Sequence, residues 1–391
     1  MLKKSMILIT LVFLQVLGFA CVVFADSYGA VYAMTNANNN AIVVYNRASD
    51  GSLTLSDYVL TRGRGSAGLR GIEPVDALGS EAPLILSRTH RWLFAVNAGS
   101  DEISVFRVDG DGLALVETVD SGGAFPASLT LHNSWLYVLN SGGEGNITGF
   151  TVGPNGHLTP ILDSTRFLNV GGSDPPFFLV SPAQVGFSPG GDFLVVTIKG
   201  SNEIRVFSVD ETGVPAADWV TTPSHGLAPF GFAFDRYGHL MVVEPFGTAN
   251  IGDPNAGAVS SYDLNRDGTL DLISASVPDF QTATCWITLI RNEPNRSFAY
   301  ATNNGSNVIS GYRVGPDGHM RLLTADGISA HTEENPVDIA ATNDGHFLYA
   351  VNAGSGTISI YRVNNTTGAL VSMGAIGGLP VDNGAVGIAA R

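Results

Sequence analysis

Residues 344–363 read DGHFLYAVNAGSGTISIYRV, and this stretch decides the fold. It contains an Asp-Gly turn, an apolar strand, an Asn-Ala-Gly loop and a second strand of the form Ile-Ser-x-Tyr-x-Val. Its centre, AVNAGS at residues 350–355, recurs unchanged at residues 95–100. A unit that recurs along a chain indicates a repeat architecture, because each unit buries its apolar faces against its neighbours.

Related copies of this unit fill the chain and align on one position at the end of an apolar strand. The residues at that position are Asn36, Asn97, Asn140, Ile198, Glu244, Asn303 and Asn352. Each copy holds about four short strands, and no convincing helical period occurs after residue 25. Seven such copies predict an all-β fold, a seven-bladed β-propeller.

The two ends of the chain indicate how the ring of blades closes. The first copy begins at its second strand, residues 30–33, and lacks an inner strand of its own. Residues 384–390 (GAVGIAA) resemble the inner strand at residues 336–341 (PVDIAA). We therefore expect the C-terminal strand to complete the first blade, which removes exposed sheet edges. One propeller domain is predicted over residues 26–391.

Composition and charge narrow the classes of partner. The chain has 391 residues, of which 45% are hydrophobic and 14% charged, as in a compact globular protein rather than a disordered one. The formal net charge is −15, and Lys199 is the only lysine after residue 4. Nucleic acid and anionic membrane surfaces are therefore not expected as partners, because both need a basic surface.

The N-terminus predicts export. Two lysines precede an apolar run that ends in Val-Phe-Ala, which is the pattern of a signal peptide over residues 1–25 with cleavage after Ala25. A secreted or periplasmic protein without membrane insertion follows; the alternative is an uncleaved segment that anchors the protein in the membrane. After cleavage Cys285 is the one cysteine left, so we expect no intramolecular disulfide, no metal site and no cofactor.

Two motifs suggest chemistry that the repeats argue against. Residues 263–271 resemble a calcium loop, but Ser274 stands where its closing glutamate belongs, and the same turn recurs in other copies. Residues 186–190 match the serine-nucleophile pattern G-x-S-x-G, which requires a strand followed by a helix. Both segments align with ordinary turns of other copies, so we interpret them as turns.

In a propeller, the loops that enter each inner strand and leave each second strand surround the channel on one face, where rigid strands can hold a binding site. The residues expected there as ligand contacts are Asn97, Asn140, Trp286, Asn303, His331 and Asn352. For the asparagines the alternative is local bonding to their own turns. Two long insertions, residues 62–80 and 246–258, lie on the same face, and the first, with Arg62, Arg64, Arg70 and Glu73, is a candidate lid.

Three residues are candidates for catalysis. Glu244 breaks the asparagine pattern, Lys199 adjoins the same position in the preceding copy, and His225 precedes the inner strand of the copy that holds Glu244. A carboxylate or imidazole can activate water while an ammonium holds a carbonyl oxygen. The alternative is a surface ion pair of little energetic value. Cys285 is interpreted as a small buried core residue.

The blade pattern of residues 344–363 resembles the lactonase-type seven-bladed propellers, a family that includes 6-phosphogluconolactonase and fungal 3-carboxymuconate cyclase. The resemblance covers the whole chain after the N-terminal segment, and segments such as Thr284-Cys-Trp286 are similar to a secreted branch. Cytosolic phosphogluconolactonases carry Pro-Arg-His where this sequence has Pro229-Phe230-Gly231. Glu244 falls near the Asn-Glu of that family, which implies that one carboxylate is shared.

Two functions follow from these observations. The first is a secreted lactonase that hydrolyses an unphosphorylated lactone, with a carboxymuconate-type cycloisomerase as the lesser enzymatic alternative. The second is a non-catalytic propeller that binds a ligand or a protein partner on the same face. The expected partner is a small molecule, and the protein is expected to be a monomer. The fold alone does not choose between the two, because function resides in the site that a fold carries.

Overall fold

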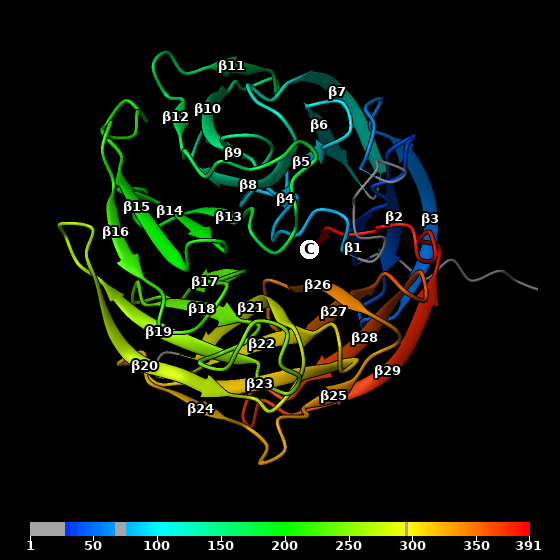
Figure 1. Ribbon diagram of the computed structural model, residues 1–391. Helices are drawn as coiled ribbons and strands as arrows, with labels where there is room; N and C mark the ends of the chain where they lie inside the picture. Colours follow the sequence, from blue (N-terminus) through cyan, green and yellow to red (C-terminus); the bar gives the residue numbers. More distant parts are fainter. Residues whose placement is uncertain (1–27, 67–75, 111, 294–295) are drawn as a thin grey trace, which may run out of the picture.

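The computed structural model describes residues 28–66, 76–110, 112–293 and 296–391, which form seven antiparallel sheets arranged as blades around a central axis (Figure 1). These residues form strands and turns and no helix. Blade 1 has β1 (Gly29–Met34), β2 (Ala41–Arg47), β3 (Leu53–Leu60) and β30 (Ile388–Ala390). Blade 2 has β4 (Leu84–Leu86), β5 (Trp92–Asn97), β6 (Glu102–Asp109) and β7 (Gly112–Asp120). Blade 3 has β8 (Pro126–His132), β9 (Trp135–Asn140), β10 (Asn146–Val152), β11 (Leu158–Pro160) and β12 (Arg166–Phe167).

The remaining four blades begin with their inner strand and continue outward in chain order. Blade 4 has β13 (Pro182–Phe187), β14 (Phe193–Ile198), β15 (Glu203–Ser208) and β16 (Val220–Pro223). Blade 5 has β17 (Phe232–Phe234), β18 (Leu240–Glu244), β19 (Ala258–Leu264) and β20 (Leu270–Pro278). Blade 6 has β21 (Thr284–Glu293), β22 (Arg296–Asn303), β23 (Val308–Val314), β24 (Met320–Leu322) and β25 (Ala330–His331). Blade 7 has β26 (Pro336–Ala341), β27 (Phe347–Asn352), β28 (Thr357–Val363) and β29 (Leu370–Gly377). The predicted seven-bladed propeller is confirmed.

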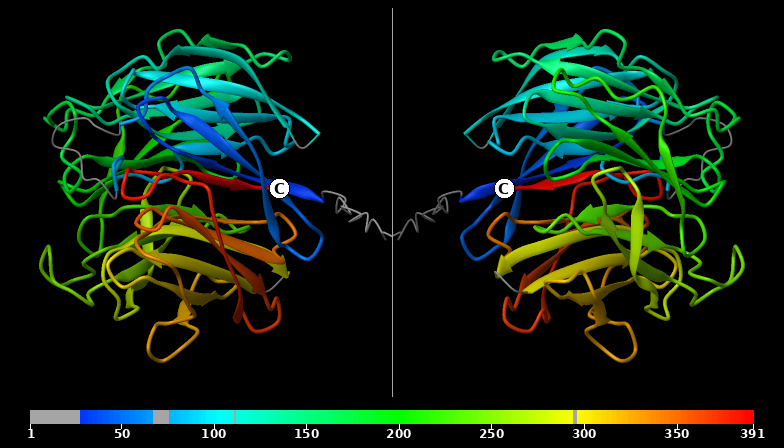
Figure 2. Two further views of the ribbon diagram at one scale, coloured as in Figure 1. Left: turned by 90° about the vertical axis from the view of Figure 1, so that its right-hand side faces the viewer. Right: turned by 90° about the vertical axis from the view of Figure 1, so that its left-hand side faces the viewer.

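The ring closes as predicted, by pairing of the last strand with the first. β30 runs antiparallel to β1, with Val31 opposite Ala390, Tyr32 opposite Ala389 and Ala33 opposite Ile388. Figure 2 shows this red strand between the blue first blade and the orange seventh blade. Gly387, the residue before β30, is also bonded to the end of β1: its carbonyl oxygen accepts from the backbone N–H of Met34 at 3.0 Å.

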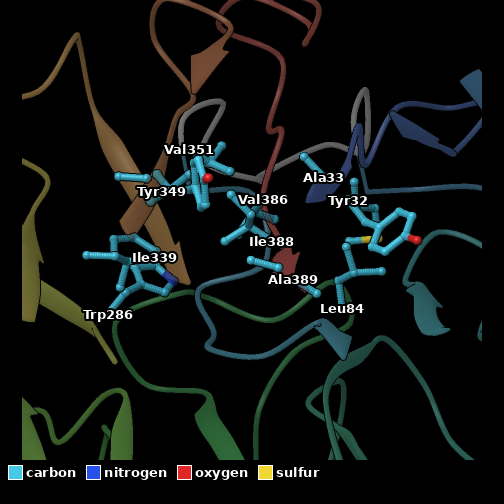
Figure 3. Packing of buried hydrophobic residues seen from close by; sticks show 14 of the residues in the cluster. Tyr32, Ala33, Leu84, Trp286, Ile339, Tyr349, Val351, Val386, Ile388 and Ala389 are labelled. Carbon is cyan, nitrogen blue, oxygen red and sulfur yellow. The ribbon is translucent and has the colours of Figure 1, made fainter. Parts of the chain in front are cut away.

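The core is built where neighbouring blades meet. Inner and second strands are buried along their whole length in several blades, as in β5 and β27, because sheets cover both of their faces. Near the axis, Val386, Ile388 and Ala389 of the closing segment lie between Trp286 and Ile339 on one side and Leu84 and Tyr32 on the other (Figure 3). The closing strand therefore contributes side chains to the core in addition to pairing with the edge of β1.

The two segments interpreted as turns are turns. Residues 265–269 connect β19 to β20, and Asp267 Oδ1 accepts hydrogen bonds from the Thr269 N–H at 3.1 Å and Oγ1 at 2.7 Å. Ser188 lies in the turn between β13 and β14, where its Oγ accepts from the Phe193 N–H at 3.1 Å. Both side chains satisfy their own turns.

Some predictions fall on residues outside the described ranges. They are the signal peptide over residues 1–25 with its cleavage after Ala25, and Arg70 and Glu73 of the candidate lid. Within the described ranges, no helix is long and apolar enough to cross a membrane.

Removal of residues 384–391 should open the ring. The deletion removes the three residue pairs with β1 and the apolar side chains that pack near Trp286, so we expect the melting temperature to fall by roughly 5 °C or more. Calorimetry or circular dichroism on heating measures this. Met373→Asp on β29, at a side chain 37% exposed, is the control and should change the melting temperature little. Unchanged stability of the truncated chain would show that the strand does not close the ring.

Candidate functional site

A cavity of about 240 Å³ lies on the predicted face, over blades 4 to 7. Its walls come from residues that follow the second strands of blades 4, 5 and 6, from residues at or before the inner strands of blades 4 to 7, and from the insertion before blade 2. The polar lining residues are Asp76, Lys199, Cys285, Asn304 and Asn335. The apolar lining residues are Phe178, Leu179, Ala228, Phe230, Pro245, Phe246, Ala283 and Trp286.

Lys199 carries its amine into this cavity. It follows Ile198, the last residue of β14, and is 2% exposed. Its Nζ donates to the carbonyl oxygen of Gly79 and lies 4.6 Å from the ring centroid of Phe230. Burial lowers the pKa of Lys199 to about 8, and the charge of Asp76 acts in the opposite direction. Lys199 is therefore an ammonium at neutral pH that loses its proton in mildly alkaline solution.

The carboxylate beside Lys199 is Asp76, and the sequence suggested Glu244 for that role. Asp76 lies in the insertion of residues 62–80, and its Oδ1 accepts from the Gly79 N–H at 2.9 Å. Gly79 has φ +58°, and a Cβ on it would stand 3.1 Å from Lys199 Nζ. The turn at Gly79 thus places two groups at the cavity: the Asp76 carboxylate, and the Gly79 carbonyl oxygen that accepts from Lys199.

Trp286 and Cys285 form the start of β21 at the cavity wall. The indole Nε1–H of Trp286 donates to the carbonyl of Ser80 at 2.8 Å, and its ring meets Phe230 edge to face at 5.1 Å between centroids. Burial raises the pKa of the Cys285 thiol well above its ordinary value, so the sulfur is protonated and is a poor nucleophile. The predicted ligand contact Trp286 is therefore in the cavity, with its polar atom already bonded.

Two buried carboxyl groups lie near the axis outside the cavity lining. Glu81 Oε2 accepts from the Ile287 N–H at 3.0 Å. Asp338 accepts from the Ile339 N–H at 2.7 Å and from the Ile388 N–H of the closing strand at 3.2 Å. Burial raises the pKa of Asp338 to about 7, and burial with repulsion from Asp338 raises that of Glu81 well above its ordinary value.

Glu244 and His225 lie together in blade 5, but neither lines the cavity. Glu244 is fully buried and accepts from Ser224 Oγ at 3.2 Å, the Gly226 N–H at 2.8 Å and Ser276 Oγ at 2.5 Å. The exposed His225 places Nδ1 2.8 Å from the same Ser276 Oγ. The serine lies between the carboxylate and the imidazole, whereas in a hydrolase triad the imidazole is central. Their catalytic role stays a prediction.

The predicted asparagine contacts are fully buried, and each donates a hydrogen bond to the third strand of its own blade. Asn97 Nδ2 donates to Ser104 Oγ at 2.8 Å, Asn303 to Ser310 at 2.8 Å and Asn352 to Ser359 at 2.9 Å. Asn140 Nδ2 donates to Asn146 Oδ1 at 2.9 Å. Each bond links the end of a second strand to the third strand, and the role of these asparagines as ligand contacts stays a prediction. His331 lies on β25, is exposed and does not line the cavity.

The sequence analysis did not identify the cavity residues and nearby buried carboxyl groups that lie outside the repeated positions of the blades. Asp76 and Glu81 belong to the first insertion and its exit, and Phe178 belongs to the connection between blades 3 and 4. Phe246, in the second insertion, lines the cavity as well. One of the buried carboxyl groups could have been found from the sequence. Asp338 interrupts an apolar inner strand, where burial of a charged side chain is unfavourable unless it has partners.

Comparisons with known proteins agree on one family. The family model described as "Lactonase, 7-bladed beta-propeller" matches residues 20–172, 169–251 and 255–381. A curated relative, the 6-phosphogluconolactonase of Serratia proteamaculans, is 24% identical over 310 residues, which cover 77% of this chain and 86% of that protein.

Solved structures show the same fold. The periplasmic gluconolactonase of Pseudomonas aeruginosa superposes with a TM-score of 0.68 at 18% identity, covering 93% of this chain and 98% of that one. A 6-phosphogluconolactonase, so assigned provisionally, from Bacteroides uniformis gives a TM-score of 0.70 at 18% identity, covering 93% and 99%. At these identities the likeness shows the fold alone.

The buried Asp338 should make stability depend on pH. Its pKa in the folded state is raised to about 7 from about 3.9 in an unfolded chain, so folding favours the protonated form. Its contribution to stability is complete below about pH 4 and is lost as the pH rises through 7. At about 1.4 kcal/mol per pKa unit the loss is a few kcal/mol. Asp338→Asn should flatten this part of the profile.

Chemical denaturation at pH 4 to 8 measures the effect as the slope of the unfolding free energy against pH. The control is Asp57→Asn, at an exposed position of β3, which should retain the wild-type slope. The slope is the readout because the amide also changes the baseline stability through its altered hydrogen bonds. Equal slopes for wild type and Asp338→Asn would contradict the raised pKa.

Proposed function

The chain belongs to the lactonase family of seven-bladed β-propellers, and from that premise we propose that it hydrolyses an unphosphorylated lactone in the central cavity. The observation that carries the proposal is the meeting of one amine and one carboxylate in a largely apolar cavity. An enclosed site of low polarity strengthens each electrostatic contact made with the reacting ester.

The charge of the cavity supports an unphosphorylated substrate. Among the described residues that line it, Lys199 is the one cation, and it already donates to Gly79 and lies near Asp76. A phosphate group is held best by several donors or cations, such as a bidentate arginine. A phosphorylated sugar lactone would bring two negative charges to a wall that offers one positive charge.

Ester hydrolysis needs a donor to the carbonyl oxygen and a base for the attacking water. In the proposed reaction Lys199 is the donor and Asp76 is the base. The Lys199 ammonium donates to the lactone carbonyl oxygen and stabilises the negative charge that forms there. The Asp76 carboxylate accepts a proton from the attacking water as its oxygen bonds to the carbonyl carbon. The tetrahedral intermediate then collapses, the ring C–O bond breaks, and the leaving alkoxide takes that proton from Asp76. The product is an open-chain hydroxy acid.

In this proposal Glu244 is a positioning residue. Its carboxylate holds the Gly226 N–H and the hydroxyls of Ser224 and Ser276, and the two residues that follow it, Pro245 and Phe246, line the cavity. His225 contacts the same cluster through Ser276. The sequence-based role of both residues in activating water is an alternative that Glu244→Gln and His225→Ala test directly.

Export and a monomeric state complete the proposal. Residues 1–25 have the pattern of a signal peptide, and one structural neighbour is described as periplasmic. A non-catalytic propeller that binds its ligand in the same cavity is the second candidate. It is favoured by Phe230 and Gly231, which stand where the cytosolic phosphogluconolactonases carry arginine and histidine.

Loss of the amine or the carboxylate should abolish turnover. Screening a lactone panel by proton release, we expect Lys199→Met and Asp76→Asn each to lower kcat by about 10²–10⁴-fold, the usual contribution of such groups. His319→Ala, at an exposed turn, is the matched control and should behave as wild type. Melting curves establish that the variants are folded. Wild-type turnover by folded Lys199→Met would overturn the assignment, and binding without turnover by the wild type would favour the second candidate.

The pH profile of kcat separates the two roles that Lys199 could have. As a donor to the carbonyl oxygen it must be protonated, so activity should fall as the pH rises through its pKa of about 8. A general base would have to be neutral, and activity would then rise over the same range. Rates between pH 6 and 9.5, corrected for spontaneous lactone hydrolysis, distinguish the two. A rise through pH 8 would contradict the donor role.

A further inference from the structure

We propose that the cavity selects lactones that carry a short apolar substituent and discriminates against polyhydroxylated sugar lactones. This inference rests on the proposed function, because it names the substrate class for the same site. It follows from three features of the cavity: the chemistry of its wall, the hydrogen bonds that its polar groups already make, and its size.

The wall is mainly aromatic and aliphatic. Phe230 and Trp286 are 3% and 0% exposed and meet edge to face, which fixes both rings. Phe178 and Phe246 add two half-buried rings from separate connections. Binding to such a wall is favoured by the burial of hydrocarbon, because each methylene removed from water strengthens binding roughly fourfold.

Several polar groups at the wall already bond to the protein, which leaves few donors and acceptors for a substrate beyond its ester group. Lys199 donates to Gly79, the Trp286 Nε1–H donates to Ser80, and Asn304 Nδ2 donates to Pro336 at 3.3 Å. Asp76 accepts from Gly79. A sugar lactone would bury three or four hydroxyl groups, and a buried hydroxyl without a partner is unfavourable. A lactone with an alkyl substituent needs polar contacts only at its ester group.

The size of the cavity limits the substituent. Its volume of about 240 Å³ lies below the ~300–1,000 Å³ typical of sites for drug-sized ligands. A five- or six-membered lactone ring therefore leaves room for a chain of a few carbons. The kcat/KM for alkyl-substituted lactones should therefore increase with the length of the alkyl chain until the chain fills the cavity, and then stop increasing.

The test compares δ-valerolactone and its 5-alkyl derivatives with glucono-δ-lactone, using kcat/KM from proton release at pH 7. We expect kcat/KM to rise about threefold to fourfold for each added methylene over the first few carbons. We expect glucono-δ-lactone to be at least 10²-fold poorer than the best alkyl lactone. Calorimetric titration with the matching alkyl lactams and with gluconolactam measures binding without turnover.

Variants connect the selectivity to this wall. Phe230→Ala should flatten the chain-length series, and Phe246→Ala, at a half-buried ring, provides the same test if the first variant folds poorly. Phe167→Ala, at a ring 60% exposed on β12, is the control and should leave the series unchanged.

The outcomes separate this inference from the proposed function. Lysine-dependent turnover of glucono-δ-lactone equal to or better than that of the alkyl lactones would overturn the inference and leave the lactonase proposal standing. Binding of alkyl lactams that depends on Phe230, with no lactone turned over, would support the substrate class and refute catalysis. A chain-length series that is flat in the wild type would also overturn the inference, whatever the absolute rates.

Discussion

The structure depends on the antiparallel pairing of β30 with β1. Three residue pairs join the last strand to the first, and Asp338 of blade 7 accepts a hydrogen bond from Ile388 of that strand. Without this contact, β1 would present an unpaired edge toward the channel. Because the contact is distant in sequence, it forms at a high cost in chain entropy and is favoured by the apolar side chains that the closing segment buries.

Closure explains why ionisable groups near the axis have shifted pKa values. The loops and inner strands of several blades meet there, so a charged group buried among them is poorly solvated. Lys199 consequently has a lowered pKa, whereas Asp338 and Glu81 have raised ones. The same exclusion of water that shifts these groups makes the Lys199 ammonium an effective partner for a polarised carbonyl. Stability and the proposed chemistry thus have one physical source.

The sequence predicted the fold well and the site only in part. Repeats reveal the blades because each copy satisfies the same local demands, which is why the asparagine position and the closing strand were found. The cavity instead depends on which insertions reach across the ring, and Asp76 and Phe178 occupy positions with no counterpart in other copies. Lys199 was identifiable because it is unique in composition. Its partners Asp76 and Gly79 were not, since contact between blades is set by the closed ring and by no periodicity in the chain.

Glu244 shows how an exception in a repeat can have a structural reason. At the same position in blades 2, 6 and 7, the asparagine side chain donates from Nδ2 to a serine hydroxyl on the third strand. In blade 5 the Glu244 carboxylate accepts from the Gly226 N–H and from the hydroxyls of Ser224 and Ser276. Its two oxygens accept all three hydrogen bonds, whereas an amide has a single acceptor oxygen. Gly226 permits the longer side chain, because a Cβ there would stand 2.3 Å from Glu244 Oε2. The glutamate therefore has a structural reason for its place in the repeat, and in the proposed mechanism it positions the two cavity-lining residues that follow it in the chain.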